Sequence, residues 1–431
     1  MTDRPAPGPP GRAPRAATDA ARPLFGGPAT AAALVLGMFT EAVGYGMVAP
    51  TLPFMARQVG AGETALGLLV GVYAAVGLFV AVPFGILAQR LGRRSLVIFG
   101  HLFLAVASIG FVLAPSYPWL LVARTVQGLG AAGVWVGSLT IAADLSADAT
   151  MGRSLAWITG AWSVGFVVGP ALGGIGTLQT PFLIYAGLST CAFFVALFGL
   201  PALGRGGPRA TFGGILAIYR RPAVLASGLA TFGLAFFYGT VEAFLPLILM
   251  GPAATGGAAE AVTGAAAAAG AMSRTRVGLL FTIAGLPSVI LPAIAGRIAD
   301  RYGDLRLIVA GFAFSAAWSL SFLPLYGRAP DAALFFLLGC VEVMVYTPAI
   351  ALLNRGMPSS DRVFASGSHS YAFSLGFFLG PLSAGLLHPI GGYPIIFGLL
   401  AAIGAAAAIA VPRVAARLSG VAPLASGARE Y

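Results

Sequence analysis

The stretch SVGFVVGPALGG at residues 163–174 returns 211 residues later as SLGFFLGPLSAG at residues 374–385. Two further stretches repeat at the same offset: GLL at 67–69 with GLL at 278–280, and GILAQRLGRR at 85–94 with GRIADRYGDL at 296–305. A threonine precedes each GLL copy by three residues, at Thr64 and Thr275. A constant offset across separate stretches indicates an internal duplication, so we predict two halves of the same architecture.

The composition is that of a membrane protein. Mean hydropathy is +0.90, hydrophobic residues make up 58% of the chain, and charged residues make up only 9%. This composition excludes a soluble domain for most of the chain. The two cysteines, Cys191 and Cys340, lie in apolar runs and are interpreted as small packing residues, without metal or redox spacing.

Twelve apolar runs are long enough to cross a hydrocarbon core of about 30 Å. They lie at 29–53, 65–88, 95–115, 118–143, 154–176, 181–201, 223–250, 277–299, 305–326, 332–353, 364–388 and 392–412. We therefore predict an all-α membrane protein with twelve transmembrane helices in two pseudo-symmetric six-helix halves, 29–201 and 223–412. Two parallel halves with a site between them near the midplane are typical of a secondary transporter.

The distribution of positive charge orients these spans. All 25 basic residues are arginine, and with the N-terminus inside, 20 of them fall in cytoplasmic segments, four fall outside, and Arg124 lies within a span. The positive-inside rule thus predicts a multi-pass protein of the cell inner (plasma) membrane with both termini cytoplasmic. The net charge of +11 then faces anionic lipid and needs no nucleic-acid partner.

Segments outside the spans are short. Residues 1–28 predict a disordered cytoplasmic tail and not a signal peptide, residues 202–222 a cytoplasmic linker, and residues 413–431 a second cytoplasmic tail. Residues 251–274 predict an exterior loop. The second half gains residues there, because the prolines that end the first and seventh spans, Pro53 and Pro246, are related by an offset of 193 and not 211.

Three motifs carry a resemblance to a known family. The first is GILAQRLGRR at 85–94. The second, in the fourth span, consists of Leu120, Arg124, Gln127, Gly128, Gly130, Ala131 and Ala132, and the third, in the fifth span, of Gly165, Gly169, Pro170, Gly173 and Gly174. Over essentially the whole chain, these motifs and their order resemble the major facilitator superfamily and, more narrowly, its twelve-span drug:proton antiporters.

The first motif resembles a latch at the cytoplasmic gate. It supplies two glycines for a tight turn and three arginines at the surface: Gly85, Gly92, Arg90, Arg93 and Arg94. Gln89 replaces the acid of the family pattern, whereas the second half keeps an acid and an arginine as Asp300 and Arg301. A glutamine makes no charge-assisted pair. Asp144, at the cytoplasmic end of the fourth span, can still pair with Arg93 or Arg94. The alternative is a positive-inside anchor only.

The third motif presents a bare glycine face for close helix packing, with a kink at Pro170. The resemblance implies a seal and hinge that favour exchange over leak. The eleventh span repeats most of the motif as Gly376, Gly380, Pro381 and Gly385, which favours a purely architectural role instead.

Arg124 lies about six residues inside the fourth span. A buried charge there is costly unless it is paired or hydrated, and it typically faces a cavity. The resemblance implies a proton-relay role, with Gln127 as a polar neighbour one turn away. The alternative is a structural pair with a glutamate.

Three glutamates lie well inside spans, and each has a tyrosine four residues away on the same helix face. The pairs are Glu41 with Tyr45, Glu242 with Tyr238, and Glu342 with Tyr346. A carboxylate beside an aromatic face suits a lipophilic cation, by Coulomb attraction and cation–π contact. The alternative is that the tyrosines only hydrogen-bond to buried acids.

Glu41 lies near the membrane midplane, where burial lets a carboxyl group hold a proton until a cation arrives. We predict proton coupling by Glu41 and Arg124. Substrate binding is predicted for the other two glutamates, the three tyrosines, Gln127 and Trp162. Phe236 and Phe237 can add apolar walls, whereas His101 and His369 are interpreted as packing or hydrogen-bonding residues.

The sequence as a whole predicts a monomeric, proton-coupled transporter that exports lipophilic, cationic small molecules without a cofactor or metal. A carrier for a metabolite such as a sugar, organic acid or siderophore is the alternative. No catalytic triad, metal-ligand spacing or phosphate loop is present in the sequence, and the chain has no lysine, which disfavours an enzyme or an ATP-driven pump.

Overall fold

The protein is described by a computed structural model over residues 27–146, 151–202, 219–250, 272–325, 332–355, 357 and 362–416. This part of the chain is helical and contains no strand. The first half consists of α1 (Pro28–Gly46), α2 (Leu52–Gln58), α3 (Glu63–Leu91), α4 (Arg93–Val112), α5 (Tyr117–Asp144), α6 (Met151–Gly173) and α7 (Thr180–Gly199). The second half consists of α9 (Pro222–Met250), α11 (Arg274–Ile290), α12 (Pro292–Tyr302), α13 (Asp304–Leu325), α14 (Ala332–Arg355) and α15 (Arg362–Ala416).

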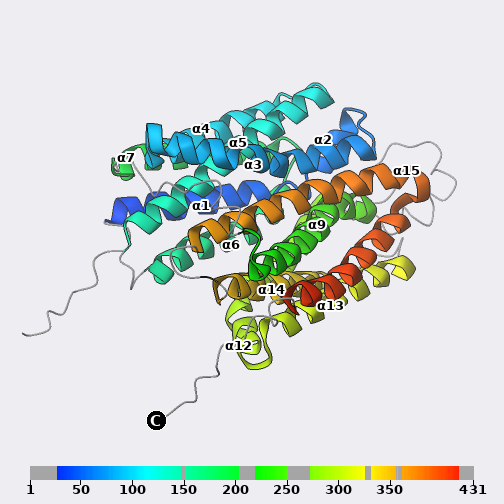
Figure 1. Cartoon of the computed structure of the whole chain (residues 1–431). Coiled ribbons are helices and arrows are strands. Elements are labelled where there is room, and N and C mark those ends of the chain that lie inside the picture. Colours follow the sequence, from blue (N-terminus) through cyan, green and yellow to red (C-terminus); the bar gives the residue numbers. More distant parts are fainter. Residues whose placement is uncertain are drawn as a thin grey trace, which may run out of the picture.

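Twelve membrane spans follow from these helices. Ten helices are long and apolar enough to cross a membrane, and α11 with α12 form one further span, bent by 54°. Helix α15 has 55 residues and a non-helical backbone at Gly391 and Gly392. At about 1.5 Å per residue it is more than twice as long as a membrane core is thick, and Figure 1 shows it turning back on itself. The predicted fold class is confirmed.

Two of the predicted spans are broken by proline. The predicted span 29–53 is helical only to Gly46, and then a turn leads into α2. Pro50 and Pro53 cannot supply backbone N–H groups, and a proline ring clashes with the carbonyl group four residues earlier. The predicted span 277–299 bends at Leu291 for the same reason, because Pro292 follows.

The two halves pack by the same backbone contacts. A Cβ atom on Gly46 would lie 2.8 Å from the carbonyl oxygen of Phe166, and one on Gly239 would lie 3.0 Å from that of Phe377. Gly46 of α1 and Gly239 of α9 are related by the offset of 193. Phe166 of α6 and Phe377 of α15 are related by the offset of 211. The duplication seen in the sequence is therefore present in three dimensions.

The tight turns predicted after the second and eighth spans occur at glycine. Gly92 has φ 90°, and Gly303, 211 residues later, has φ 95°. Side chains other than glycine rarely adopt this backbone conformation. Each turn leads directly into the next helix, α4 in the first half and α13 in the second.

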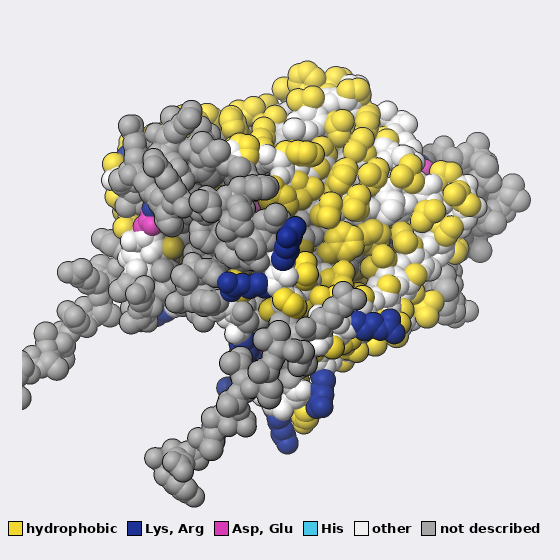
Figure 2. Space-filling view, viewed as in Figure 1, with side chains coloured by type: hydrophobic (Ala, Val, Ile, Leu, Met, Phe, Trp, Pro, Cys, Tyr) yellow, Lys and Arg dark blue, Asp and Glu magenta, His cyan; other side chains and the backbone are white. Residues whose placement is uncertain are grey.

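The outer surface is largely apolar. Large side chains such as Phe79, Phe198 and Ile390 are more than 70% exposed on it. Figure 2 shows a broad hydrophobic face with arginine side chains gathered in the lower part of the view. This pattern suits a lipid-facing belt bordered by a polar surface.

Several predicted features lie outside the described residues. They are residues 1–26 of the first tail, 203–218 of the linker, 251–271 of the exterior loop and 417–431 of the second tail. The surroundings of Gly85 and the side chains of Gln89 and Arg90, at the end of α3, also lie outside them.

Candidate functional site

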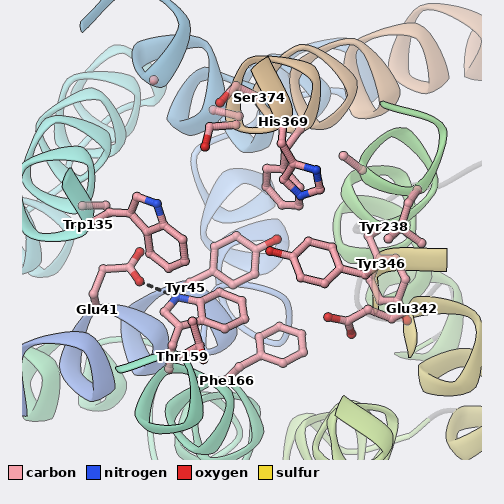
Figure 3. Close-up of a pocket in the computed structure, with 18 of the residues that line it drawn as sticks. Glu41, Tyr45, Trp135, Thr159, Phe166, Tyr238, Glu342, Tyr346, His369 and Ser374 are labelled. Carbon is pink, nitrogen blue, oxygen red and sulfur yellow. Dashed lines mark hydrogen bonds between the residues drawn. The ribbon is translucent and has the colours of Figure 1, made fainter. Parts of the chain in front are cut away.

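A pocket of about 600 Å³ lies between the two halves. In Figure 3, Glu41 and Trp135 lie on one side of it, and Tyr238, Tyr346 and Glu342 lie on the other. The predicted residues that line it are Glu41, Tyr45, Trp162, Tyr238, Glu342 and Tyr346, whereas the lining does not include Arg124, Gln127 or Glu242. Both halves thus contribute one carboxyl group each to a mainly aromatic and aliphatic cavity.

Glu41 is held by two hydrogen-bond donors from other helices. The Tyr73 hydroxyl group donates to Oε1 at 2.7 Å, and the Trp162 indole N–H donates to Oε2 at 2.6 Å. Both oxygens of the carboxyl group are therefore occupied, and the group is fixed at the pocket wall. Tyr45, four residues along α1, is not one of these donors.

Aromatic rings surround Tyr45 at the centre of the pocket. Its ring centroid lies 5.8 Å from that of Tyr73, 6.0 Å from that of Trp162 and 5.6 Å from that of Phe377. Trp162 in turn stacks on Phe166 at 5.4 Å with nearly parallel planes. Such a cage presents several π faces to a bound ligand.

Arg124 lies behind this wall, buried inside the first half. Its Nη1 donates to Gln127 at 2.7 Å, and the guanidinium group lies 4.4 Å from the ring centroid of Tyr73. Tyr73 therefore lies between Arg124 and Glu41. Its hydroxyl group donates to Glu41, and its ring faces the guanidinium group of Arg124. The predicted neighbour Gln127 is confirmed, and its amide also donates to the carbonyl group of Gly44.

Glu242, on α9 of the other half, lies close enough to Arg124 for their charges to attract, although the two form no ion pair within the described part of the chain. Glu242 is buried and lies near the hydroxyl group of Tyr45. Its own helix neighbour Tyr238 donates instead to the carbonyl group of Leu338 at 2.8 Å. The tyrosine that binds Glu41 thus comes from another helix, and Tyr238 does not bind Glu242, so the four-residue spacing does not mark the hydrogen-bond partners.

Glu342 is the less constrained of the two pocket carboxyl groups. Within the described part of the chain, its Oε2 has no hydrogen-bond partner. Nearby, His369 pairs through Nδ1 with the Thr231 hydroxyl group at 2.8 Å and packs edge-on against Tyr346. Glu342 is accordingly the wall position where a ligand can add a new interaction.

Ion pairs lie at the first motif and at its repeat in the second half. Arg93 pairs with Asp144, as expected, and Arg94 donates to the carbonyl group of Leu197 at 2.6 Å. In the second half, Arg355 pairs with Asp300 and, at 3.0 Å, with Asp304. The neighbouring Arg301 lies over the ring of Tyr302, 5.3 Å from its centroid. Each pair ties helices within its own half.

The glycines of the fifth-span motif have two kinds of neighbour. Gly165 and Gly169 leave no room for a Cβ atom against the α1 backbone at Phe39 and Val43, and Gly173 leaves none against Met47, directly after α1. Gly174 and Pro170 instead touch α11 of the other half, at Thr275 and Gly278. The first three build one half, and the last two lie where the halves meet.

A symmetric pair of hydrogen bonds closes the end of the molecule where α3 and α11 begin. Thr64 donates to the carbonyl group of Gly385 at 2.9 Å, and Thr275 donates to that of Gly174 at 2.8 Å. The two bonds are related by the offset of 211. Arg274 adds donors to the carbonyl groups of Ile175 and Thr177.

Sequence reasoning missed Tyr73 and Trp135 as pocket residues. Both are on spans of ordinary aromatic content, and neither lies four residues from an acid. One signal was available for Tyr73: Gly128 of the second motif has no Cβ, and its backbone approaches the Tyr73 carbonyl oxygen. Such a glycine marks where the helix carrying Arg124 lies closest to its neighbour.

A pocket enclosed by two duplicated six-helix bundles near the middle of their spans defines a membrane carrier. The family model of the Major Facilitator Superfamily matches residues 34–275 and 260–429. The chain belongs to this superfamily, as the motifs indicated.

Relatives of known name are transporters. Multidrug resistance protein 1 of Bacillus subtilis is 26% identical over 394 residues, covering 88% of this chain and 95% of that protein. The MFS-type transporter ppzB of Metarhizium majus is also 26% identical, covering 87% of this chain and 97% of that one. Quinolone resistance protein NorA of Staphylococcus aureus is 26% identical over 38% of this chain and 43% of its own length.

Solved structures share the fold. A point mutant of the nucleoside transporter NupG superposes with a TM-score of 0.73 at 13% identity, covering 89% of this chain and 99% of that chain. A POT family transporter in complex with a thioalcohol conjugated peptide has a TM-score of 0.72 at 13% identity, covering 92% of this chain and 98% of that one.

Proposed function

We propose that this protein exports lipophilic organic cations in exchange for protons. The observation that carries the proposal is that Glu41 and Glu342, one from each half, line a single aromatic pocket. A delocalised cation gains Coulomb attraction from the carboxylates and cation–π contact from the rings. The relatives named for multidrug and quinolone resistance support export of drug-like compounds.

Proton coupling rests on the two environments of the acids. Glu41 can exchange a proton with the cavity while Tyr73 and Trp162 hold it in place. Behind it, Arg124 of the first half and Glu242 of the second attract each other across the boundary between the halves. Any rocking of one half against the other changes that attraction, which links protonation to conformation.

The direction of access follows from the closed end. The arginine count assigns the start of α3 and α11 to the exterior, where the Thr64 and Thr275 bonds join the halves. In this arrangement the exterior is sealed, and the fifth-span motif acts as part of the seal through Gly174 and Pro170. The ion pairs at the first motif then stiffen each half at the cytoplasmic gate.

The proposal is tested in proteoliposomes with an imposed pH gradient. Tetraphenylphosphonium and a rhodamine dye serve as lipophilic cations, and a sugar and a dicarboxylate serve as metabolite probes. We expect cation accumulation that collapses with a protonophore, and proton release when the cation is added to protein in detergent. Transport of the sugar or dicarboxylate without proton release would establish the metabolite carrier instead.

The orientation is tested by labelling. A cysteine placed within 255–270 of a cysteine-free variant should react in intact cells with an impermeant thiol reagent, and tags at both termini should be protected. Labelling of the loop only after lysis would reverse the topology and, with it, the direction of export.

A further inference from the structure

Six polar side chains in the core of the first half are fully buried and hold polar atoms without partners among the described residues. They are Thr40, His101, Arg124, Ser138, Tyr185 and Ser189. None of them is among the residues that line the substrate pocket. Each such atom costs about 1–3 kcal/mol if it stays unpaired, so a set of this kind implies a partner that the described residues do not supply.

The hydroxyl groups of this set differ from the other buried hydroxyls of the chain. Ser108, on the same helix as His101, donates to the carbonyl group of Leu104 in its own helix at 2.6 Å. Thr231 and Ser319 do the same at 2.9 and 2.8 Å. Thr40, Ser138 and Ser189 have no such bond within the described residues, so their helices do not satisfy them.

One face of α1 connects the members of the set. At Gly44, the Tyr185 hydroxyl group occupies the space where a Cβ atom would lie, and Gln127, the partner of Arg124, donates to the Gly44 carbonyl group. At Gly37, a Cβ atom would lie 2.9 Å from Nε2 of His101. Thr40 lies between these two glycines on the same face. The distance along the helix from Gly44 to Gly37 is about 10 Å.

The set continues toward the cytoplasmic end. Val134 of α5 contacts the same Gly37 position, and Ser138 follows it by one helical turn. Ser138 precedes Asp144, at the cytoplasmic end of α5, by about 9 Å of helix. On α7, Ser189 lies one turn further inward than Tyr185, and the two hydroxyl groups approach each other without a well-formed hydrogen bond. The six side chains therefore follow one another in depth, from Arg124 toward the end of α5 that carries Asp144. We call this row of buried polar side chains the file.

The second half has no such file. At the equivalent positions it carries Gly233, Phe312, Phe335, Ala349, Ile396 and Leu400. The five of these with side chains are at most 2% exposed, so they fill the same space with carbon. The polar set is thus a property of one half and not a requirement of the shared packing.

We propose that this file binds a chain of internal water molecules, separate from the substrate pocket, and that the chain carries protons between Arg124 and the cytoplasmic side. Water is the ligand whose size and mixed donor and acceptor capacity fit hydroxyl, imidazole and guanidinium groups together. The proton-carrying role rests on the proposed proton coupling, whereas the hydration does not.

Hydration is tested on the unmodified protein by hydroxyl-radical labelling, in which bound water generates the radical beside the side chain it contacts. Tyr185 and His101 should be modified several times faster than Phe312 and Phe335, which are equally buried aromatic controls. Equal, slow modification of all four would overturn the water chain, whatever the protein transports.

The proton role is tested by giving the first half the residues of the second. His101→Phe with Ser138→Ala should slow pH-driven accumulation several-fold and leave substrate counterflow, which needs no net proton movement, at the level of the Ser108→Ala control. Unchanged pH-driven transport would overturn the proton role. If the unmodified protein shows no pH-driven transport, the proposed function fails, and the labelling result still decides the hydration.

Discussion

Where α5 ends in the first half, Arg93 pairs with Asp144, and 211 residues later Asp304 pairs with Arg355, so the same contact is made with opposite charges. Arg93 begins α4 and Asp144 ends α5, whereas Asp304 begins α13 and Arg355 ends α14. Helix N-termini favour negative charge and C-termini favour positive charge. The second-half pair agrees with both helix dipoles, and the first-half pair opposes both.

The cores of the two halves also differ at positions related by the offset of 211. Where the first half places Arg124 and His101, the second places Phe335 and Phe312, and all four are buried. The backbone contacts at glycine are nevertheless shared. Duplication has therefore preserved how the helices approach each other while the side-chain chemistry has diverged. The first half carries costly polar groups, which indicates work beyond holding the fold.

Exchanging residues across the repeat should give the largest effect. Phe335→Arg puts an unpaired charge into an apolar core beside Phe281, at a cost of several kcal/mol. We expect loss of folded protein, measured as the yield of monodisperse material in detergent. Arg124→Phe should fold at or above the wild-type unfolding temperature and lose pH-driven transport. Equal stability of the two variants would show that the halves tolerate charge alike.

The next largest effect is expected at the two pocket carboxyl groups, which should respond differently to the loss of their charge. Glu41→Gln fixes the group as neutral, so we expect loss of uphill, pH-driven accumulation, with binding of cations weakened and binding of neutral compounds largely kept. Glu342→Gln should mainly weaken cation binding. Transport in proteoliposomes and substrate-induced proton release measure both variants.

A control is needed because a glutamine offers one acceptor to the two donors on Glu41. Tyr73→Phe removes one donor and keeps the carboxyl group. If Tyr73→Phe abolishes coupling as fully as Glu41→Gln, the hydrogen bond matters and not the charge. If Glu41→Gln still accumulates substrate against its gradient, Glu242 or Glu342 becomes the coupling candidate.

Much of the fold that the two halves share could be predicted from the sequence. The offsets of 211 and 193, the spans and the span-five glycines predict the fold, because hydrophobic length and close packing are local properties. The partners of the acids were not predictable. Glu41 is bound by Tyr73 and Trp162 from other helices, and such contacts depend on helix rotation and tilt. The breaks at Pro50 and Pro292 were visible as residues, yet a continuous hydrophobic run concealed them.

The hydrogen bonds of Thr64 and Thr275 test whether the halves remain equivalent at their boundary. Thr64→Ala and Thr275→Ala each remove one bond to a carbonyl group of the other half. Each bond contributes about 1 kcal/mol, so each variant should shift the conformational equilibrium toward exterior opening by about fivefold. Distance distributions between spin labels at the start of α3 and at the turn of α15 near Gly391 would show it. Clearly unequal shifts would mean that one bond governs the seal.

The reversed ion pairs should give the smallest effect. The double variant Arg93→Asp with Asp144→Arg keeps the pair and gives it the polarity of the second half. Each charge then meets a favourable helix end, and we expect a gain of at most about 1 kcal/mol, since both side chains are partly exposed and screened. The measurement is the unfolding temperature of the purified protein at low salt.

The matched control is the reverse exchange, Asp304→Arg with Arg355→Asp. It opposes both dipoles and brings the new carboxylate beside Asp300, which now pairs with Arg355, so its unfolding temperature should fall. High salt should shrink both shifts. If both exchanges lower stability equally, the dipoles do not decide the comparison, and the native polarity of each pair is set by neighbours within its own half.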